Sequence, residues 1–398
     1  EEHDLSGVPH LTRLALKVAA RIKWGTMLVE TPDGRVFRFE GQERPEEVGV
    51  IIIKDYRFAP RLMFGGGVGF FQAFADDQWD SPDVAQFLRV VAANADRMQE
   101  YFRGNTLIRR INYLVHLMRR NTKIGARRNI MAHYDLGNSF YETWLDRSMT
   151  YSSAKFEHPD QDLQAAQTNK YRELARRINL QADESVLEIG SGWGGFAEFA
   201  AGEVGARVTG ITISPEQYDY ARERMFKAGL NDKVEIRLQD YRDVEDKFDK
   251  VASIEMFEAV GKEYWPTYFN KVRNSLKPGG LAGLQIITID DRYFDRYQRS
   301  ADFIQRFIFP GGMLPSPQVL REHIAGAGLA WRENVNFGVD YADTLKSWQE
   351  RFVSAWDDIR TLGFDERFNK LWRYYLSYCE AGFRAGTIDV TQVTVARP

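Results

Sequence analysis

The sequence predicts an α/β protein, in which a doubly wound, Rossmann-like parallel sheet is preceded by a small α+β domain. From about residue 165, apolar runs typical of strands alternate with amphipathic helical stretches. The first of these strands leads into a glycine-rich turn at 190–195, where sheets of this kind bind their ligands. Before about residue 100, a helix and alternating apolar runs around a turn indicate a separate small unit.

Local signals define the N-terminal elements. Residues 11–22 have the apolar spacing of a helix, and alternating runs flank the turn dipeptide Asp33-Gly34, which predicts a hairpin. The run 49–55 indicates another strand. Ser81 and Pro82 predict the N-cap and the first residue of a second helix. We expect these elements to form a small domain over residues 1–103.

A basic segment follows this domain. Residues 101–134 contain no Asp or Glu, and their basic residues are Arg103, Arg109, Arg110, Arg119, Arg120, Lys123, Arg127 and Arg128. Apolar residues lie between them, so 104–135 is expected to be a basic amphipathic helical connector. It could lie on an anionic membrane surface, or it could be a solvated helix that joins two domains.

Residues 136–398 are expected to form the doubly wound domain. Its predicted helices are 215–229 and 265–280, and the C-terminal third is rich in aromatic residues typical of helices that complete a core. The predicted strands precede and alternate with these helices at 185–189, 206–214, 234–243, 248–255 and 281–289.

Composition limits the function classes. The net charge of −3 argues against a nucleic-acid partner, and the single cysteine, Cys379, excludes an intrachain disulfide and a multi-cysteine metal site. The apolar runs are too short to span a bilayer, and the first ten residues are too polar for a secretory signal. We therefore expect a reducing, cytoplasmic location and no metal ion.

The glycine turn suggests the cofactor. Glu188 lies two residues before Gly190, whereas the end of the second strand lacks the acidic residue that usually binds the ribose of a dinucleotide. The pattern looks like a class I S-adenosylmethionine-dependent methyltransferase, with an NAD-binding dehydrogenase as the alternative. Because the methyl donor is a sulfonium cation, carboxylates and aromatic faces near the turn suit it.

Several strings extend this interpretation to a family. They include AHYDLGNSFYETWLD, MTYSSAKF, VLEIGSGWGGFAEFAA, GITISPEQ, SIEMFEAVG, FIFPGGMLPS and NFGVDYADTLKSWQERF, in order over about residues 130–390. Together they resemble the cyclopropane-fatty-acyl-phospholipid synthases and their mycolic-acid-modifying relatives. The N-terminal unit also resembles the small domain of bacterial members, where it would contribute a lipid or dimer contact.

The resemblance implies methyl transfer to a cis double bond in an acyl chain of a membrane phospholipid, through a carbocation. Proton loss from the new methyl group closes a cyclopropane, and loss from a neighbouring carbon leaves a methyl- or methylene-branched chain. The implied partners are unsaturated phospholipid acyl chains, an anionic membrane surface and a second copy in a homodimer. The implied location is peripheral, at the inner face of the cytoplasmic membrane.

The resemblance also assigns residues to roles. Glu258 takes the position of the family's active-site glutamate, and Tyr341 takes that of its tyrosine. The residues implied to line S-adenosylmethionine are Tyr151, Ser152, Gly190, Gly192, Thr212, Ile213, Gln217 and Gln239. Each assignment has a structural alternative: Glu258 could cap a helix, and Tyr341 could be a core aromatic.

Two departures concern the base. Cyclopropanating members commonly bind bicarbonate through a cysteine, the glutamate, a histidine and the tyrosine, but this chain has Ser153 for the cysteine and Gln285 for the histidine. Serine and glutamine can still donate hydrogen bonds to an anion, so bicarbonate stays open as a second ligand. Glu255 stands where those sequences have glycine. We hypothesise that Glu255 or Glu258 accepts the proton or stabilises the cation; alternatively, Glu255 binds the donor or a backbone amide.

We therefore predict an S-adenosylmethionine-dependent C-methyltransferase with catalytic residues Glu258, Glu255, Tyr341, Gln285 and Ser153. The incomplete bicarbonate site favours a branched, uncyclised product, and cyclopropane formation is the alternative. A methyltransferase for a small natural product and a silent lipid-binding protein are two further alternatives.

Overall fold

The computed structural model describes residues 5–98, 125, 136–299 and 301–398. The chain forms two compact units, and each combines separate stretches of sequence. The first contains Glu1–His116, Arg296–Ile308 and Trp348–Thr387; the second contains the rest. The basic connector expected over 104–135 lies outside the described residues, apart from Gly125. Within the described part, no helix is both long and apolar enough to cross a membrane.

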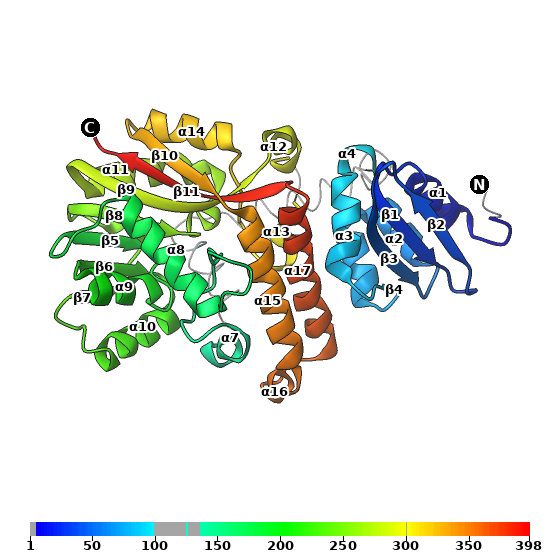
Figure 1. Cartoon of the computed structure of the whole chain (residues 1–398), viewed down its shortest axis with the longest axis horizontal. Coiled ribbons are helices and arrows are strands. Elements are labelled where there is room, and N and C mark those ends of the chain that lie inside the picture. Colours follow the sequence, from blue (N-terminus) through cyan, green and yellow to red (C-terminus); the bar gives the residue numbers. More distant parts are fainter. Residues whose placement is uncertain (1–4, 99–124, 126–135, 300) are drawn as a thin grey trace. The chain divides into compact units, whose positions relative to one another are not determined.

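A four-stranded sheet in the order β2-β1-β3-β4 forms the centre of the first unit (Figure 1). The hairpin predicted around Asp33-Gly34 is present, with β1 antiparallel to β2, whereas β1 is parallel to β3. The elements of this unit are α1 (His10–Ala19), β1 (Trp24–Glu30), β2 (Val36–Glu40), β3 (Glu43–Ile53), α2 (Phe58–Ala75), β4 (Trp79–Asp80), α3 (Val84–Ala93), α4 (Ala95–Met98), α13 (Phe303–Phe307), α16 (Trp356–Thr361) and α17 (Glu366–Arg384).

The core of the first unit joins residues far apart in the chain. Trp79 is fully buried and stacks on Phe70 with ring centroids 4.3 Å apart. Phe71 packs against Tyr374 of α17 at 5.2 Å, and Phe74 contacts the same ring at 5.6 Å. The C-terminal helix α17 therefore completes the hydrophobic core of the N-terminal sheet and helices.

The predicted start of the second N-terminal helix is wrong by two residues. The helix α3 begins at Val84, and its N-cap is Asp83, whose carboxylate accepts a hydrogen bond from the Gln86 amide at 2.9 Å. The Ser81 hydroxyl instead accepts from the Asp83 amide, at 3.2 Å. An aspartate is at least as good an N-cap as a serine, and the one nearer the helix takes the role.

The second unit is built on a seven-stranded sheet in the order β10-β11-β9-β8-β5-β6-β7. The strands β9, β8, β5, β6 and β7 are parallel, as the sequence predicts, but β11 is antiparallel to both β9 and β10. The elements are α7 (Asn138–Trp144), α8 (Leu163–Arg177), β5 (Ser185–Ile189), α9 (Gly195–Phe199), the π-helix η1 (Ala200–Val204), β6 (Arg207–Thr212), α10 (Pro215–Lys227), β7 (Val234–Leu238), η2 (Tyr241–Asp243), β8 (Phe248–Ile254), η3 (Phe257–Ala259), η4 (Lys262–Tyr264), α11 (Trp265–Ser275), β9 (Leu276–Ile289), α14 (Pro317–Gly326), β10 (Ala330–Asn336) and β11 (Ile388–Ala396). Two further helices, α12 (Asp291–Tyr297) and α15 (Gly338–Ser354), begin in this unit and end in the first.

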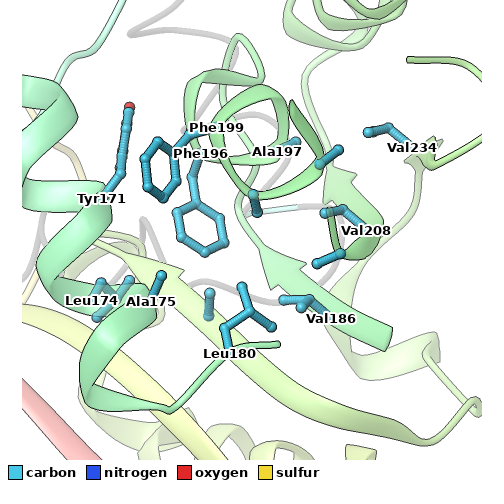
Figure 2. Close-up of a cluster of buried hydrophobic side chains, with 14 of the residues drawn as sticks. Tyr171, Leu174, Ala175, Leu180, Val186, Phe196, Ala197, Phe199, Val208 and Val234 are labelled. Atoms are coloured by element: carbon cyan, nitrogen blue, oxygen red, sulfur yellow. The ribbon is translucent and has the colours of Figure 1, made fainter. Parts of the chain in front are cut away.

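A hydrophobic cluster joins α8, α9 and α10 to this sheet (Figure 2). Tyr171 of α8 packs against Phe196 and Phe199, with ring centroids 5.8 and 6.0 Å apart, and Val186 and Val208 contribute from the strands. The Tyr171 hydroxyl lies 2.7 Å from Oγ1 of Thr150, the second residue of the MTYSSAKF segment. This packing holds α8 against one face of the parallel sheet.

Candidate active site

The glycine turn after β5 has the geometry of a ligand-binding loop. Gly190, Gly192 and Gly194 all have positive φ, at 82°, 53° and 85°. A Cβ atom on Gly190 would lie 2.7 Å from Met256 Cγ, whereas one on Gly192 would meet nothing within 4 Å. The backbone at Gly190 is thus closely packed, while Gly192 leaves space that a ligand can approach.

A buried carboxylate lies beside this turn. Glu188 is buried in β5, and its Oε2 atom has no hydrogen-bond partner among the described residues. Burial raises the pKa of Glu188 well above its usual range, and the charges of Arg224 and Lys170 oppose this shift. A cationic ligand beside this unused oxygen would favour the ionised form of Glu188.

The residues predicted to line the donor at the next two strands lie together. The Thr212 hydroxyl donates a hydrogen bond to Gln217 Oε1 at 3.0 Å. The backbone amide of Gln239 donates to the backbone carbonyl of Thr212 at 2.9 Å. Ile213 follows Thr212 directly and is half-buried. These residues extend the edge that Gly190 and Gly192 begin.

Aromatic rings connect the MTYSSAKF segment to the glycine turn. Tyr151 packs against Tyr141 and Trp144, at centroid distances of 5.4 and 5.5 Å. Tyr141 in turn packs against Trp193, within the glycine turn, at 5.0 Å. This wall offers faces to a sulfonium cation. The Ser152 hydroxyl, by contrast, accepts a hydrogen bond from Lys170 at 2.6 Å, so its predicted contact with the donor stays a prediction.

Glu255 is the point at which four predicted residues meet. Its Oε1 accepts from the Ser153 backbone amide at 2.8 Å and from Gln285 Nε2 at 2.7 Å. Its Oε2 accepts from the Tyr341 hydroxyl at 2.5 Å. Ser153 contributes its backbone rather than its side chain, because its hydroxyl donates to the Ala154 carbonyl. The three donors come from the segment after α7, from β9 and from α15.

The backbone of Glu255 is unusual. Its φ is +51°, in the left-handed region that glycine prefers and that costs other residues about 1–2 kcal/mol. The Glu255 amide donates to the Gln285 carbonyl at 2.8 Å, which holds the chain in this conformation as it leaves β8. The carboxylate is thereby aimed at its three donors instead of continuing the strand.

Glu258 has a different environment. Its Oε1 accepts from the Ile287 amide at 2.5 Å, but its buried Oε2 has no partner among the described residues. Burial, and next the charge of Glu255, raise the pKa of Glu258 to about 8. Burial also raises the pKa of Glu255, but Lys170 and the three hydrogen bonds oppose this. In this coupled pair we therefore assign the negative charge to Glu255 and the proton to Glu258.

Two polar residues of the site escaped prediction. Gln392 of β11 donates to Gln285 Oε1 at 3.0 Å, which leaves the Gln285 amino group facing Glu255. Lys170 of α8 is fully buried. A signal existed for Lys170: with Gln167 it occupies core-facing positions of the helix, between Leu163 and Leu174. Among the residues described, no group of His, Cys, Asp and Glu side chains could hold a metal ion.

The fold and the glycine turn define the class: this is a class I S-adenosylmethionine-dependent methyltransferase, and S-adenosylmethionine is its cofactor. Residues 121–393 match the family model described as mycolic acid cyclopropane synthetase, which is more than half of the chain. The chain belongs to this family, so the family prediction is confirmed.

Named relatives of this chain include both methyltransferases and cyclopropane synthases. Tuberculostearic acid methyltransferase UfaA1 of Mycobacterium tuberculosis is 38% identical over 370 residues, or 90% of this chain and 85% of the relative. The cyclopropane-fatty-acyl-phospholipid synthase of Escherichia coli K12 is 33% identical over 380 residues, or 93% and 95%. The crystal structure of mycolic acid cyclopropane synthase CmaA1 complexed with SAH and CTAB has a TM-score of 0.64 and 28% identity, and it covers 68% of this chain and 98% of that one.

Substitution of Gly190 tests the cofactor loop. An alanine there must adopt a left-handed conformation and displace Met256, so we expect Gly190→Ala to weaken S-adenosylhomocysteine binding by at least about tenfold in titration calorimetry. The matched control is Gly229→Ala, which has the same sign of φ (+68°) but open space around it, after α10. Equal affinities in the two variants would contradict the assignment.

Glu258 should impose a pH dependence on stability. The folded chain keeps the Glu258 proton up to about pH 8, whereas the unfolded chain loses it near pH 4.5, so this group reduces stability as pH rises through that window. Glu258→Gln cannot ionise. We expect its urea midpoint to fall less between about pH 5 and 8 than the midpoint of the unmodified protein. Exposed Glu245→Gln is the control, and parallel curves for all three proteins would refute the shift.

Proposed function

We propose that this enzyme transfers a methyl group from S-adenosylmethionine to the cis double bond of unsaturated acyl chains in membrane phospholipids, and that it releases a methyl- or methylene-branched product without closing a ring. The observation that carries the proposal is the Glu255 carboxylate, held by Ser153, Gln285 and Tyr341. The names of the relatives support the substrate class: one is a tuberculostearic acid methyltransferase and another a cyclopropane-fatty-acyl-phospholipid synthase.

The reaction needs an acceptor for one proton. When bound, S-adenosylmethionine supplies an electrophilic methyl group. The π electrons of the acyl double bond form the new carbon–carbon bond, the sulfur keeps the electrons of the broken bond, and a positive charge remains on the acyl chain. Loss of a proton from the new methyl group, with a bond to the cationic carbon, closes the ring. Loss from a neighbouring chain carbon leaves a methyl-branched alkene. A 1,2-hydride shift onto the cationic carbon, followed by proton loss from the methyl group, leaves a methylene branch. A saturated branch would require a separate reductase.

Glu255 is suited to accept this proton. It is buried, so its carboxylate is a stronger base than one in water, and Lys170 together with three hydrogen bonds favours its ionised form. Its negative charge also stabilises the acyl cation. Glu258 keeps its proton and is therefore a neutral neighbour of Glu255. Its Oε2, which has no partner among the described residues, can face the acyl chain.

The same arrangement argues against an external base. Gln285 and Tyr341 are two positions that the family resemblance assigns to bicarbonate, and here both donate to Glu255. Bicarbonate in that place would put a second anion beside a buried carboxylate. Cyclopropane formation with Glu255 as base is the second candidate, and the relationship to the synthase of E. coli favours it.

The remaining parts of the proposal concern location and partners. A peripheral position at the inner face of the cytoplasmic membrane, contact with anionic lipid through the basic connector and a homodimer fit a substrate embedded in a bilayer. The basic composition of 104–135 is the observation that supports the lipid contact.

Product analysis tests the function directly. The protein is incubated with S-adenosylmethionine and mixed unsaturated phospholipid vesicles. The fatty acids are then released from the lipids and analysed by mass spectrometry. We expect a mass increase of one CH2 group, which a ring would also give, together with the fragmentation typical of a branched alkene. A ring would establish the second candidate. No change in any lipid, despite measurable S-adenosylmethionine binding, would overturn the proposal.

Glu255→Gln tests the base. Glutamine keeps the size and can still accept from Tyr341, but it cannot take a proton, so we expect the rate of product formation to fall by about 10²–10⁴-fold. Affinity for S-adenosylhomocysteine should change by no more than a few-fold. Glu245→Gln is again the control. If Glu255→Gln lost only a few-fold of its activity, the base role would be wrong.

Glu255→Gly separates an internal from an external base. Glycine accepts the left-handed φ of this position, and its lack of a side chain frees the three donors to bind a small anion. We expect Glu255→Gly to be nearly inactive and to recover activity with added bicarbonate, while the unmodified enzyme does not respond to it. A bicarbonate requirement in the unmodified enzyme would contradict the proposal.

A further inference from the structure

Lys170 is a buried cation that enters the reaction scheme only through its effect on the ionisation of Glu255. It lies in α8 with no exposed surface, and its Nζ donates to Ser152 Oγ at 2.6 Å. Within the described part of the chain, no carboxylate lies within the 4.0 Å of an ion pair with it. Burial of an ammonium without a carboxylate partner costs free energy. The Tyr171 ring, whose centroid lies 4.7 Å from Nζ, offsets part of this cost, and charges further away offset more of it.

Those charges are the carboxylates around the site. Burial lowers the pKa of Lys170 to about 7, and the negative charge of Glu255, followed by those of Asp146 and of ionised Glu188, opposes this shift. They come from three separate places: the end of β8, the loop after α7, and β5. Arg224, the other cation facing Glu188, is paired with Glu198.

The groups that face Glu255 are few. Lys170 from α8 is the cation that favours its ionised form, Tyr341 from α15 donates a hydrogen bond, and Glu258 from η3 is the acidic neighbour. Lys170 therefore differs from the rest in contributing a positive charge. Because the surroundings exclude water, this charge acts over a longer range than it would at the surface.

Lys170 also bears on Glu255 through hydrogen bonds. By holding the Ser152 side chain it fixes the turn whose next amide, that of Ser153, donates to Glu255. Its backbone carbonyl accepts from Gln392 Nε2 at 3.3 Å, and the same Gln392 orients Gln285 toward Glu255. Lys170 thus acts on the Glu255 carboxylate both through its charge and through hydrogen bonds to neighbouring residues.

We propose that Lys170 is a positioning residue for Glu255: its buried ammonium keeps Glu255 ionised and holds the Ser152–Ser153 backbone that grips the carboxylate. The inference rests on the proposed function, in which Glu255 is the base. Lys170 does not touch the reacting atoms in this scheme. It acts on the proton affinity of the group that does.

The test measures protonation of Glu255 directly. The carbonyl stretch of a protonated carboxyl group is followed by infrared spectroscopy as a function of pH, and the band of Glu255 is the one missing from Glu255→Gln. Two variants remove the charge: Lys170→Gln keeps a donor for Ser152, and Lys170→Met is apolar and suited to a buried position. Ser152→Ala is the matched control, because it removes the hydrogen bond and keeps the charge.

We expect the protonation midpoint of Glu255 to rise by about one pH unit or more in Lys170→Gln and Lys170→Met, and by much less in Ser152→Ala. The acidic limb of the pH profile of kcat/KM should move in parallel, with a loss that approaches tenfold below the Glu255 midpoint of the unmodified enzyme and disappears above about pH 7, where Lys170 itself loses its charge. Circular dichroism and S-adenosylhomocysteine affinity report whether each variant folds. Of the two charge-removing variants, either one that folds suffices for the measurement.

The two proposals fail in different ways. If the infrared midpoint is unchanged in a folded Lys170 variant, the inference about Lys170 is overturned, whatever the role of Glu255. If activity falls equally at every pH while the midpoint stays, Lys170 has only a structural role. If the midpoint moves but Glu255→Gln remains active, Lys170 sets the ionisation of Glu255 as inferred, and it is the base role that fails.

Discussion

The structure of the site depends on one requirement, that a buried carboxylate must be satisfied. Glu255 has lost its water, and three donors replace it: a backbone amide, a side-chain amide and a phenol. Each donor belongs to a different part of the second unit, so the segment after α7, the strand β9 and the helix α15 must all be in place. The strained backbone at Glu255 is tolerated because these contacts determine it.

The neighbouring Glu258 makes this arrangement chemically useful. Two carboxyl groups close together in a buried site do not both ionise easily, and their surroundings decide which one keeps the proton. Glu255 has three donors and a nearby ammonium, whereas Glu258 has one backbone amide and an unpaired oxygen. The asymmetry favours the ionised form of Glu255 and the neutral form of Glu258. Under the proposed function, Glu255 would accept the proton in a site that lacks a cysteine and a histidine for an external anion.

Much of this could be predicted from the sequence, for identifiable reasons. Alternation of strands and helices and the glycine turn are local signals. The family resemblance points to Tyr341, and departures from it point to Ser153, Glu255 and Gln285. The sequence did not indicate that Ser153 would act through its amide, because that depends on the path of the chain. Gln392 was missed because its place beside Gln285 results from the pairing of β11 with β9. Lys170 was missed because lysine is normally exposed, although its helical spacing from Leu163 and Leu174 marks a core-facing position. Asp83 displaced Ser81 as a helix cap because two good capping residues stood close together.

The discontinuity of the first unit has a consequence for biosynthesis. The rings of Phe71 and Phe74 pack against Tyr374, which leaves the ribosome about 300 residues later. At typical translation rates of about 5–20 residues per second, the N-terminal segment waits roughly 15–60 s with its aromatic face uncovered. During that interval the nascent chain exposes a hydrophobic surface that favours aggregation with other chains. A chain truncated anywhere before α17 would leave these aromatic side chains permanently exposed. Stable folding of the first hundred residues therefore depends on synthesis of the last helix.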